Sequence, residues 1–262
     1  MPTLSAIISW RFYTQDQYRL MNNRSTIVNR LRIITEDRIS LLWLLLISGD
    51  VAFILLYIFN RMYRFMDMEI IRLDIDGSHP EFYQYTKFVW ILILLIYTAL
   101  TTKNKSYLSW ILVFLYFLTD DVLRLHERSG RFLNERVTFE PPFELRVQDV
   151  GEFAAFAIFG LPLLALLGWT YFRGSLTFKK ISRDLMLLVV VFAFFVVIFD
   201  ILHAAVDLSP SMNRIWTLIE DGGEMIVVST MVWYLFRVAF YKGEPKTFLL
   251  DSPTEDTPVA PA

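Results

Sequence analysis

The sequence predicts an all-α integral membrane protein with about six transmembrane helices. Of its 262 residues, 55% are hydrophobic, and the mean hydropathy of +0.44 is too high for a soluble domain, whose surface must be polar. Several apolar stretches are also long enough to cross about 30 Å of hydrocarbon at about 1.5 Å per residue. We therefore expect the lipid bilayer to surround most of the chain, in a plasma membrane or a bacterial inner membrane.

Three regions follow from the order of these stretches. Residues 1–38 form an arginine-rich segment in which Ile27, Leu31 and Ile34 share a helix face, so it is either an amphipathic helix on the membrane or a solvated cytoplasmic arm. Residues 39–240 form the membrane domain. Residues 241–262 are rich in proline, threonine and acids, and predict a disordered cytoplasmic tail. The expected spans are 39–59, 83–101, 107–125, 150–172, 185–207 and 218–240.

The distribution of lysine and arginine predicts the orientation, because short cytoplasmic loops retain positive charge. Basic residues precede the first span, join the second to the third, join the fourth to the fifth and follow the sixth. All four segments fall on one side if the chain crosses about six times. Both termini are therefore expected in the cytoplasm, with the loops after the first, third and fifth spans outside.

Composition excludes several classes of site and partner. The chain contains no cysteine, so disulfide bonds, thiolate nucleophiles and cysteine-rich metal sites are absent, and a bound metal must take oxygen and imidazole ligands. The net charge of -2 and the scattered basic residues give no support to a nucleic-acid partner. The sequence also lacks the glycine-rich phosphate loop, the Gly-x-Ser-x-Gly elbow and the His-Glu-x-x-His zinc motif. No catalytic residue is assigned.

Acids and imidazoles gather at the outer ends of four expected spans. The third span ends in TDDVLRLHE, the fourth begins in QDVGEF, the fifth ends in FDILHAAVD and the sixth begins in EDGGEM. At about 100° per residue, three sets share a helix face, namely Asp200 with His203 and Asp207, Glu220 with Glu224, and Asp120 with Arg124 and Glu127. On a continuous third helix, His126 points away from the last set.

The two outer hairpins resemble each other. The run DVLRLHER at 121–128 aligns without gaps with DILHAAVD at 200–207, and QDVGEF aligns with EDGGEM. Both copies cross the membrane in the same direction, which predicts an internal repeat related by an axis along the membrane normal. Helices three to six would then form a four-helix bundle, with the polar site within 107–240.

The aspartates at these helix ends need compensation. Asp120, Asp121, Asp200 and Asp207 lie near C-terminal helix ends, where the helix dipole repels an anion. A carboxylate ionised within the hydrocarbon costs at least about 2.5–3.5 kcal/mol. Arginine side chains, bound protons or a metal ion would each supply the missing positive charge.

A metal ion has a geometric precedent. Ferritin-like four-helix bundles hold two metals with a lone glutamate from each of two helices and Glu-x-x-His from each of the other two. This chain resembles that arrangement, with Glu152 and Glu224 as lone carboxylates and Asp200-Ile-Leu-His203 as one acid-x-x-His pair. We predict a site for Fe, Mn or Zn made of these residues and completed by Asp120, Asp121 or Glu127.

The second acid-x-x-His pair is broken, because Arg124 stands where the second histidine is expected. Either one metal remains and Arg124 replaces the charge of the other, which we favour, or His126 reaches in from two residues later. If the protein is an enzyme, the metal would activate water or oxygen against a lipophilic substrate.

Asp50 lies in the middle of the first span with no charged neighbour in its own helix, and is a candidate ligand, proton carrier or arginine partner. A protonated structural aspartate is the alternative. Two other functions therefore stay open beside the metal site. One is a proton- or cation-coupled transporter, since parallel repeats around buried acids also build carriers. The other is a non-catalytic subunit whose apolar surface docks other membrane proteins.

Overall fold

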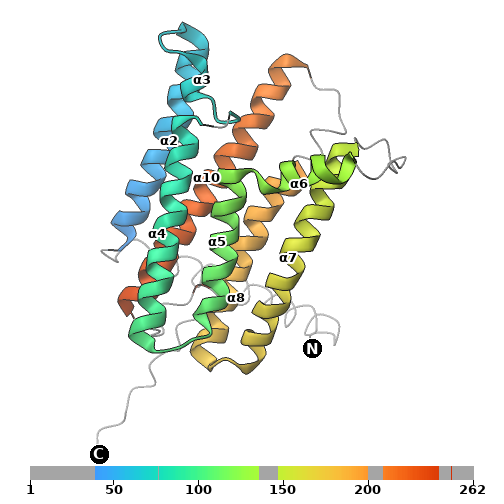
Figure 1. Cartoon of the computed structure of the whole chain (residues 1–262). Helices are drawn as coiled ribbons and strands as arrows, with labels where there is room; N and C mark the ends of the chain where they lie inside the picture. The colour runs from blue at the N-terminus through green and yellow to red at the C-terminus, as the bar shows by residue number, and fades with distance from the viewer. Residues whose placement is uncertain (1–38, 76, 136–146, 200–208, 242–248, 250–262) are drawn as a thin grey trace, which may run out of the picture. The chain divides into compact units, whose positions relative to one another are not determined.

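The computed structural model describes residues 39–75, 77–135, 147–199, 209–241 and 249, and its regular elements in these ranges are all helical (Figure 1). The chain divides into two compact units, Met1–Leu45 and Leu46–Ala262, and the polar site lies wholly in the second. The helices are α2 (Ser40–Tyr63), α3 (Met68–Ile71), α4 (His79–Thr102), α5 (Tyr107–Leu123), α6 (Leu125–Asn134), α7 (Val147–Arg173), α8 (Leu176–Ala193), the π-helix η2 (Phe194–Phe199) and α10 (Pro210–Tyr241).

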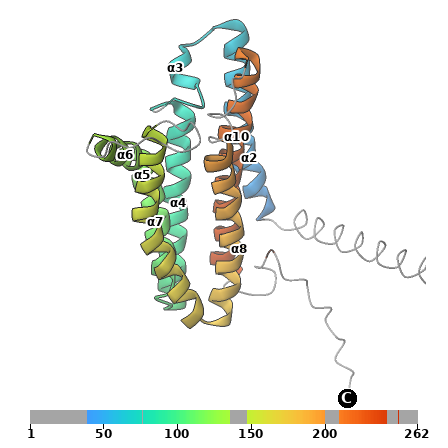
Figure 2. The same cartoon turned by 90° about the vertical axis from the view of Figure 1, so that its right-hand side faces the viewer.

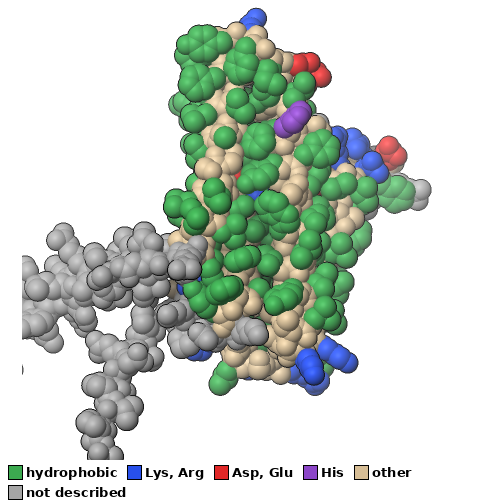
Figure 3. Space-filling model, turned by 90° about the vertical axis from the view of Figure 1, so that its left-hand side faces the viewer, with side chains coloured by type: hydrophobic (Ala, Val, Ile, Leu, Met, Phe, Trp, Pro, Cys, Tyr) green, Lys and Arg blue, Asp and Glu red, His purple; other side chains and the backbone are tan. Residues whose placement is uncertain are grey.

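Four helices are long and apolar enough to cross a membrane: α2, α4, the part of α7 from Ala154 to Arg173 and the part of α10 from Met212 to Tyr241. Large hydrophobic side chains remain exposed along them, including Leu100, Trp169 and Phe172. Figure 3 shows one face covered by hydrophobic side chains, with lysine and arginine gathered at its lower edge. Such a surface suits an apolar solvent, so the prediction of a helical membrane protein is supported by four candidate spans in the described residues, while the count of six stays a prediction.

Helix ends follow local capping chemistry. Ser78 caps α4 by accepting a hydrogen bond from the backbone N–H of Glu81, with Pro80 and Glu81 in the first turn. Ser175 caps α8 in the same way through the N–H of Phe178. Both arrangements satisfy N–H groups that an α-helix leaves without internal partners, and the cap of α4 begins this helix beside the polar site.

Helix α10 is at the centre of the second unit and packs against α4, α8 and η2, while α5 packs between α4 and α7 (Figures 1 and 2). The glycines of α10 allow close contact. A Cβ on Gly222 would lie 3.1 Å from Cδ1 of Ile54, and one on Gly223 would lie 2.8 Å from Cζ of Phe195. Small residues let neighbouring helices approach closely in a membrane, and that is their role at both positions.

The third expected span does not continue as one helix to Glu127. Helix α5 ends at Leu123, Arg124 adopts the left-handed conformation with φ of 50°, and α6 begins at Leu125. Figure 1 shows α6 lying across the ends of α5 and α7. The expected common face of Asp120, Arg124 and Glu127 is therefore wrong, because the chain changes direction between them.

The basic loops between α4 and α5 and between α7 and α8 lie at the same end of the second unit (Figure 1). Lys103 and Lys105 belong to the first loop, and Arg173 ends α7 at the second. Their common location agrees with the charge distribution used to predict the orientation. Residues 1–38, 76, 136–146, 200–208, 242–248 and 250–262 lie outside the described ranges.

Candidate functional site

A fully buried ion pair links α2, α4 and α10. Nζ of Lys87 donates to Oδ1 of Asp50 at 2.9 Å, and both side chains are 0% exposed. The same ammonium donates to the carbonyl of Met225 at 2.9 Å and to Oγ of Ser229 at 3.3 Å. Ser229 in turn donates to Oδ2 of Asp50 at 2.6 Å. Two opposite charges and their hydrogen bonds therefore hold three helices together within an apolar interior.

The partner of Asp50 comes from the buried stripe of α4. Gln84, Lys87 and Ile91 all belong to this stripe, which repeats every three to four residues and faces α10. Tyr83 covers the ammonium, with Nζ of Lys87 4.7 Å from the centre of its ring. Asp50 thus has a lysine partner, where the sequence suggested an arginine or a bound proton.

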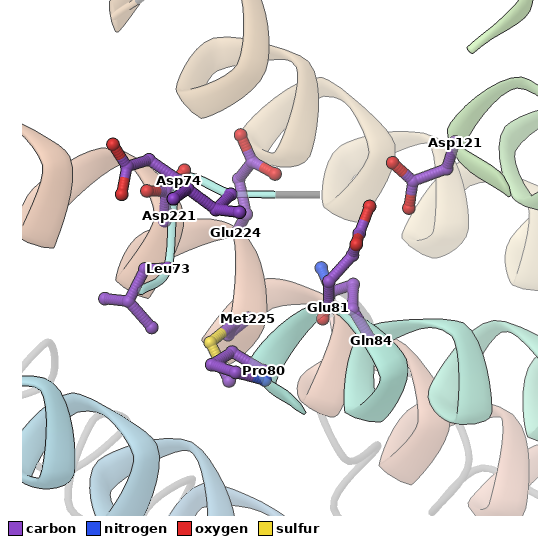
Figure 4. A pocket seen from close by; sticks show the side chains of 10 residues that line it. Leu73, Asp74, Pro80, Glu81, Gln84, Asp121, Asp221, Glu224 and Met225 are labelled. Carbon is purple, nitrogen blue, oxygen red and sulfur yellow. The ribbon is translucent and has the colours of Figure 1, made fainter. Parts of the chain in front are cut away.

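An acidic cavity of about 200 Å³ lies beside this ion pair. Figure 4 shows its walls, which come from the segment between α3 and α4, the first turns of α4, the end of α5 and the N-terminal half of α10. Among the described residues, its lining contains five carboxylates and no basic side chain. The lining residues are Leu73, Asp74, Ile75, Pro80, Glu81, Gln84, Asp121, Asp221, Glu224 and Met225.

The cavity and the ion pair share one face of α10. Asp221, Met225 and Ser229 follow one another at intervals of four residues, so they line up along the helix. Met225 lines the cavity, and its carbonyl accepts from Lys87. Glu224, also in the lining, is close enough to interact electrostatically with Lys87. The cavity and the buried ion pair are therefore adjacent along α10, with Met225 common to both.

The side-chain oxygen of Gln84 is a hydrogen-bond acceptor to which no described residue donates. Its side chain lines the cavity and is 7% exposed, and its Oε1 accepts no hydrogen bond from any described residue. A buried amide oxygen left without a donor costs roughly 1–3 kcal/mol. The lining is thus rich in acceptors, both charged and neutral, and a donor would stabilise it.

Two of the carboxylates are held by their neighbours. Nε of Arg72 donates to Oδ1 of Asp74 at 2.9 Å, and Nη2 of Arg72 contacts Oδ2. Partial burial acts to raise the pKa of Asp74, but the hydrogen bonds and charge of Arg72 outweigh it and lower the pKa. Glu81 accepts from the N–H of Gly77 and from the hydroxyl of Tyr85.

The predicted site residues divide into several groups. Asp121 and Glu224 both line the cavity. Asp120 accepts from the backbone N–H of His126 at 2.9 Å, and its Oδ2 lies 2.9 Å from Nδ1 of the same residue. The turn at Arg124 brings His126 back to Asp120, so the prediction that His126 points away is wrong.

Of the other predicted residues that the structure describes, Glu127 and Glu220 are not in the cavity lining. Glu127 lies on α6 at 3.7 Å from Arg131. Glu220 precedes Asp221 on α10 and acts on it electrostatically. Asp200, His203 and Asp207, and with them the 200–207 half of the predicted repeat's second copy, lie outside the described residues, as does the side chain of Glu152. Their grouping as metal ligands stays a prediction.

Within the described part of the chain, no group of three or more histidine, aspartate or glutamate side chains is arranged to hold a metal ion. The carboxylates of the cavity are spread around its walls, with Asp74 and Asp221 towards one side and Asp121 towards the other in Figure 4. A bare metal ion needs its ligands converging within about 2–2.6 Å. The carboxylates of the described lining do not converge in this way.

Lys87 was missed by the sequence reasoning, although a signal was present. It is a lone basic residue inside an expected span, as Asp50 is a lone acid inside another. Isolated opposite charges in two spans tend to pair, since each is costly alone. Asp74, Glu81 and Gln84 were missed because only their assembly with α5 and α10 gives them a common location.

A second buried polar cluster lies nearer the opposite end of α10. Oδ2 of Asp184 accepts from the hydroxyl of Tyr234 at 3.1 Å and from the backbone N–H of Leu249 at 2.7 Å, and Asp184 is 0% exposed. Nε1 of Trp110 donates to Oγ of Ser182 at 2.9 Å nearby on α8. Polar groups thus reach the interior of the second unit from both ends.

The fold and site define a multi-pass helical membrane protein with a buried charge cluster beneath an acidic cavity. The chain belongs to the family described as Domain of unknown function (DUF8692), whose model matches residues 70–238. The match extends from α3 through most of α10 and includes every residue of the cavity lining, while Asp50 precedes it. No curated protein and no solved structure matches the chain.

Proposed function

We propose that this protein is a six-span, proton- or cation-coupled transporter, with both termini in the cytoplasm and the acidic cavity open to the outside. The observation that carries the proposal is the position of the buried pair of Asp50 and Lys87 beside the acidic cavity, with Met225 common to both. Charged residues inside membrane spans mark ion and substrate pathways. The carboxylates would concentrate cations at the entrance, because their fields add in a cleft.

Six spans follow if α5 and the α8–η2 pair also cross. Helix α5 has 17 residues, and the continuous stretch from Leu176 to Phe199 joins α8 to η2. At about 1.5 Å per residue both approach the thickness of the hydrocarbon. With six crossings, the loops of Lys105 and of Arg173 would lie on the same side as both termini, and their positive charge favours the cytoplasm for that side.

Lys87 supplies the counter-charge in the resting state. Its ammonium occupies acceptors on Asp50, Met225 and Ser229. A cation arriving from the cavity would compete with Lys87 for the same oxygens, so occupancy of the site is coupled to displacement of the lysine. The polar cluster of Asp184 and Tyr234 supports an exit towards the cytoplasmic end. Buried Met231 and Val232 lie between the two clusters on α10 and would separate them.

The test is ion flux in proteoliposomes containing the purified full-length protein. A trapped pH-sensitive dye reports proton movement when Na⁺, K⁺, Mg²⁺ or an ammonium compound is added outside. We expect a cation-dependent signal that Asp50→Asn abolishes and that Glu69→Gln retains, because Glu69 is exposed on α3 outside the cavity lining. Absence of any cation-dependent flux, or full activity of Asp50→Asn, contradicts transport.

The topology is tested separately. The chain has no cysteine, so single cysteines can be introduced without background and labelled with a membrane-impermeant maleimide in intact cells. We expect a cysteine at Glu69 to be labelled from outside and one at Lys105 only after permeabilisation. Labelling of both from the same side rules out the proposed topology.

A metal centre is the second candidate, favoured by the common location of Asp121 and Glu224 in the cavity lining. It would require Glu152, Asp200 and His203 to converge on these two residues and hold Fe, Mn or Zn. Elemental analysis of the purified protein decides this. A stoichiometric metal that is lost on combining Asp200→Ala with Glu224→Ala supports the centre, and a metal-free protein excludes it.

A further inference from the structure

We propose that the acidic cavity binds a small aliphatic diamine, whose two primary ammonium groups contact carboxylates on opposite walls. The inference rests on the proposed function, because it names the class of cation that enters the transport pathway. It is carried by the geometry of the lining and by the way in which the protein holds its own primary ammonium.

The lining selects a donor-rich, positively charged ligand. All charged side chains among its described residues are carboxylates, which accept hydrogen bonds and donate none when ionised. The buried Oε1 of Gln84 adds a neutral acceptor that no described residue satisfies. An ammonium group carries three donors and no acceptor, so it complements this surface. An anion would be repelled by it.

The distribution of the charges distinguishes an organic cation from a metal ion. No three acidic or histidine side chains within the described residues converge as metal ligands do. Figure 4 instead shows Asp74 and Asp221 at one side of the cavity, Asp121 at the other and Glu224 between them. Two positive charges held apart by a short chain match such a spread better than one point charge.

The apolar part of the lining favours an alkyl chain. Leu73, Pro80 and Met225 are buried and contribute to the walls. A hydrated metal ion gains nothing from such surface, whereas the methylene groups of an alkyl chain are stabilised by burial against it. The volume of about 200 Å³ is smaller than the roughly 300–1,000 Å³ of pockets for drug-sized ligands. A diamine of a few carbon atoms is therefore the expected size.

Lys87 shows that a primary ammonium fits the oxygens next to the cavity. Its Nζ lies 2.9 Å from Oδ1 of Asp50, 2.9 Å from the Met225 carbonyl and 3.3 Å from Oγ of Ser229. These three acceptors satisfy the three donors of one ammonium group. A ligand ammonium advancing from Glu224 would meet the same type of coordination, with Lys87 as its competitor.

Binding of butane-1,4-diamine to the purified full-length protein in detergent, measured by isothermal titration calorimetry, tests the inference. We expect saturable binding that is about tenfold weaker for Asp221→Asn and for Asp121→Asn, because each loses one charge-assisted contact of about 1.4 kcal/mol. Butylamine, with one ammonium, should bind more weakly than the diamine. Glu69→Gln is the matched control, since it removes an acid at the same end of the fold outside the lining.

The outcomes separate this inference from transport itself. Diamine binding without flux supports the site and contradicts the transporter. Flux of another cation without diamine binding contradicts the proposed diamine site and is still consistent with a transporter. Binding of Ca²⁺ or Mg²⁺ in place of the diamine, or diamine binding that neither Asp221→Asn nor Asp121→Asn weakens in correctly folded protein, overturns the inference. Folding of each variant is checked by gel filtration.

Discussion

Replacing Lys87 with methionine tests how much the buried ion pair contributes to stability. The substitution removes the ion pair to Asp50 at 2.9 Å and the hydrogen bonds to Met225 and Ser229. It leaves Asp50 with a hydrogen bond from Ser229, at a position that is 0% exposed. Breaking a buried pair by removing one partner costs about 3–5 kcal/mol. We expect Lys87→Met to lower the free energy of unfolding by that amount.

The double variant Asp50→Asn with Lys87→Met should recover most of this loss. It removes both charges, so no uncompensated carboxylate remains in the apolar interior. The coupling free energy between the two positions is then at least about 1.5 kcal/mol. Unfolding by increasing proportions of sodium dodecyl sulfate, followed by tryptophan fluorescence, gives these free energies. Lys105→Met is the control, because Lys105 is exposed in the α4–α5 connection.

Two results would refute this reasoning. A loss below about 1 kcal/mol for Lys87→Met is that of an ordinary surface substitution and would mean that the pair is not buried. Additive effects in the double variant would mean that the two side chains do not interact.

Three further predictions follow from other parts of the fold. Because Arg72 lowers the pKa of Asp74, their pair stabilises the fold above about pH 4, the usual pKa of aspartate. This contribution is lost as the pH falls through the lowered pKa. Arg72→Gln should therefore weaken the acid dependence of the melting temperature, and an unchanged pH profile contradicts this prediction. Gly223→Ala should lower the free energy of unfolding by about 1–3 kcal/mol, because the new Cβ meets the ring of Phe195. Gly168→Ala, with open space around the glycine, is the control and should be neutral or stabilising by up to about 1 kcal/mol. Equal effects of the two substitutions in detergent unfolding would contradict the close packing at Gly223. Lys103→Gly should stabilise the protein by roughly 1 kcal/mol, since Lys103 caps the C-terminal end of α4 with φ of 53°, a conformation that glycine adopts without strain. A lower melting temperature of this variant would contradict the prediction.

The positions of the helices follow closely from hydropathy. The expected spans 83–101 and 107–125 correspond to α4 and α5, and 150–172 corresponds to most of α7. The start of α8 at Leu176 was placed too late, since the charged residues from Lys179 to Arg183 were assigned to a loop. Helices continue beyond the hydrocarbon where charged side chains reach water, so an apolar stretch marks a span but not the ends of its helix.

The candidate site was predictable only in part. Acids at the outer ends of α5 and α10 were expected to meet, and Asp121 and Glu224 do line one cavity. The break at Arg124 was not predictable, because neither glycine nor proline marks it, and it moved His126 to Asp120 and Glu127 away from the cavity lining. A left-handed residue without glycine depends on its tertiary surroundings.

The sequence by itself determined that the chain is a helical membrane protein, because hydropathy and helical spacing are local properties that neighbouring residues decide. Only the tertiary structure decided which polar groups meet. Asp50 and Lys87 are 37 residues apart and Lys87 and Ser229 are 142 apart, so their contact depends on the depth and rotation of three helices. Those quantities are set by packing around α10, where the glycines allow close approach and where each buried charge requires a partner.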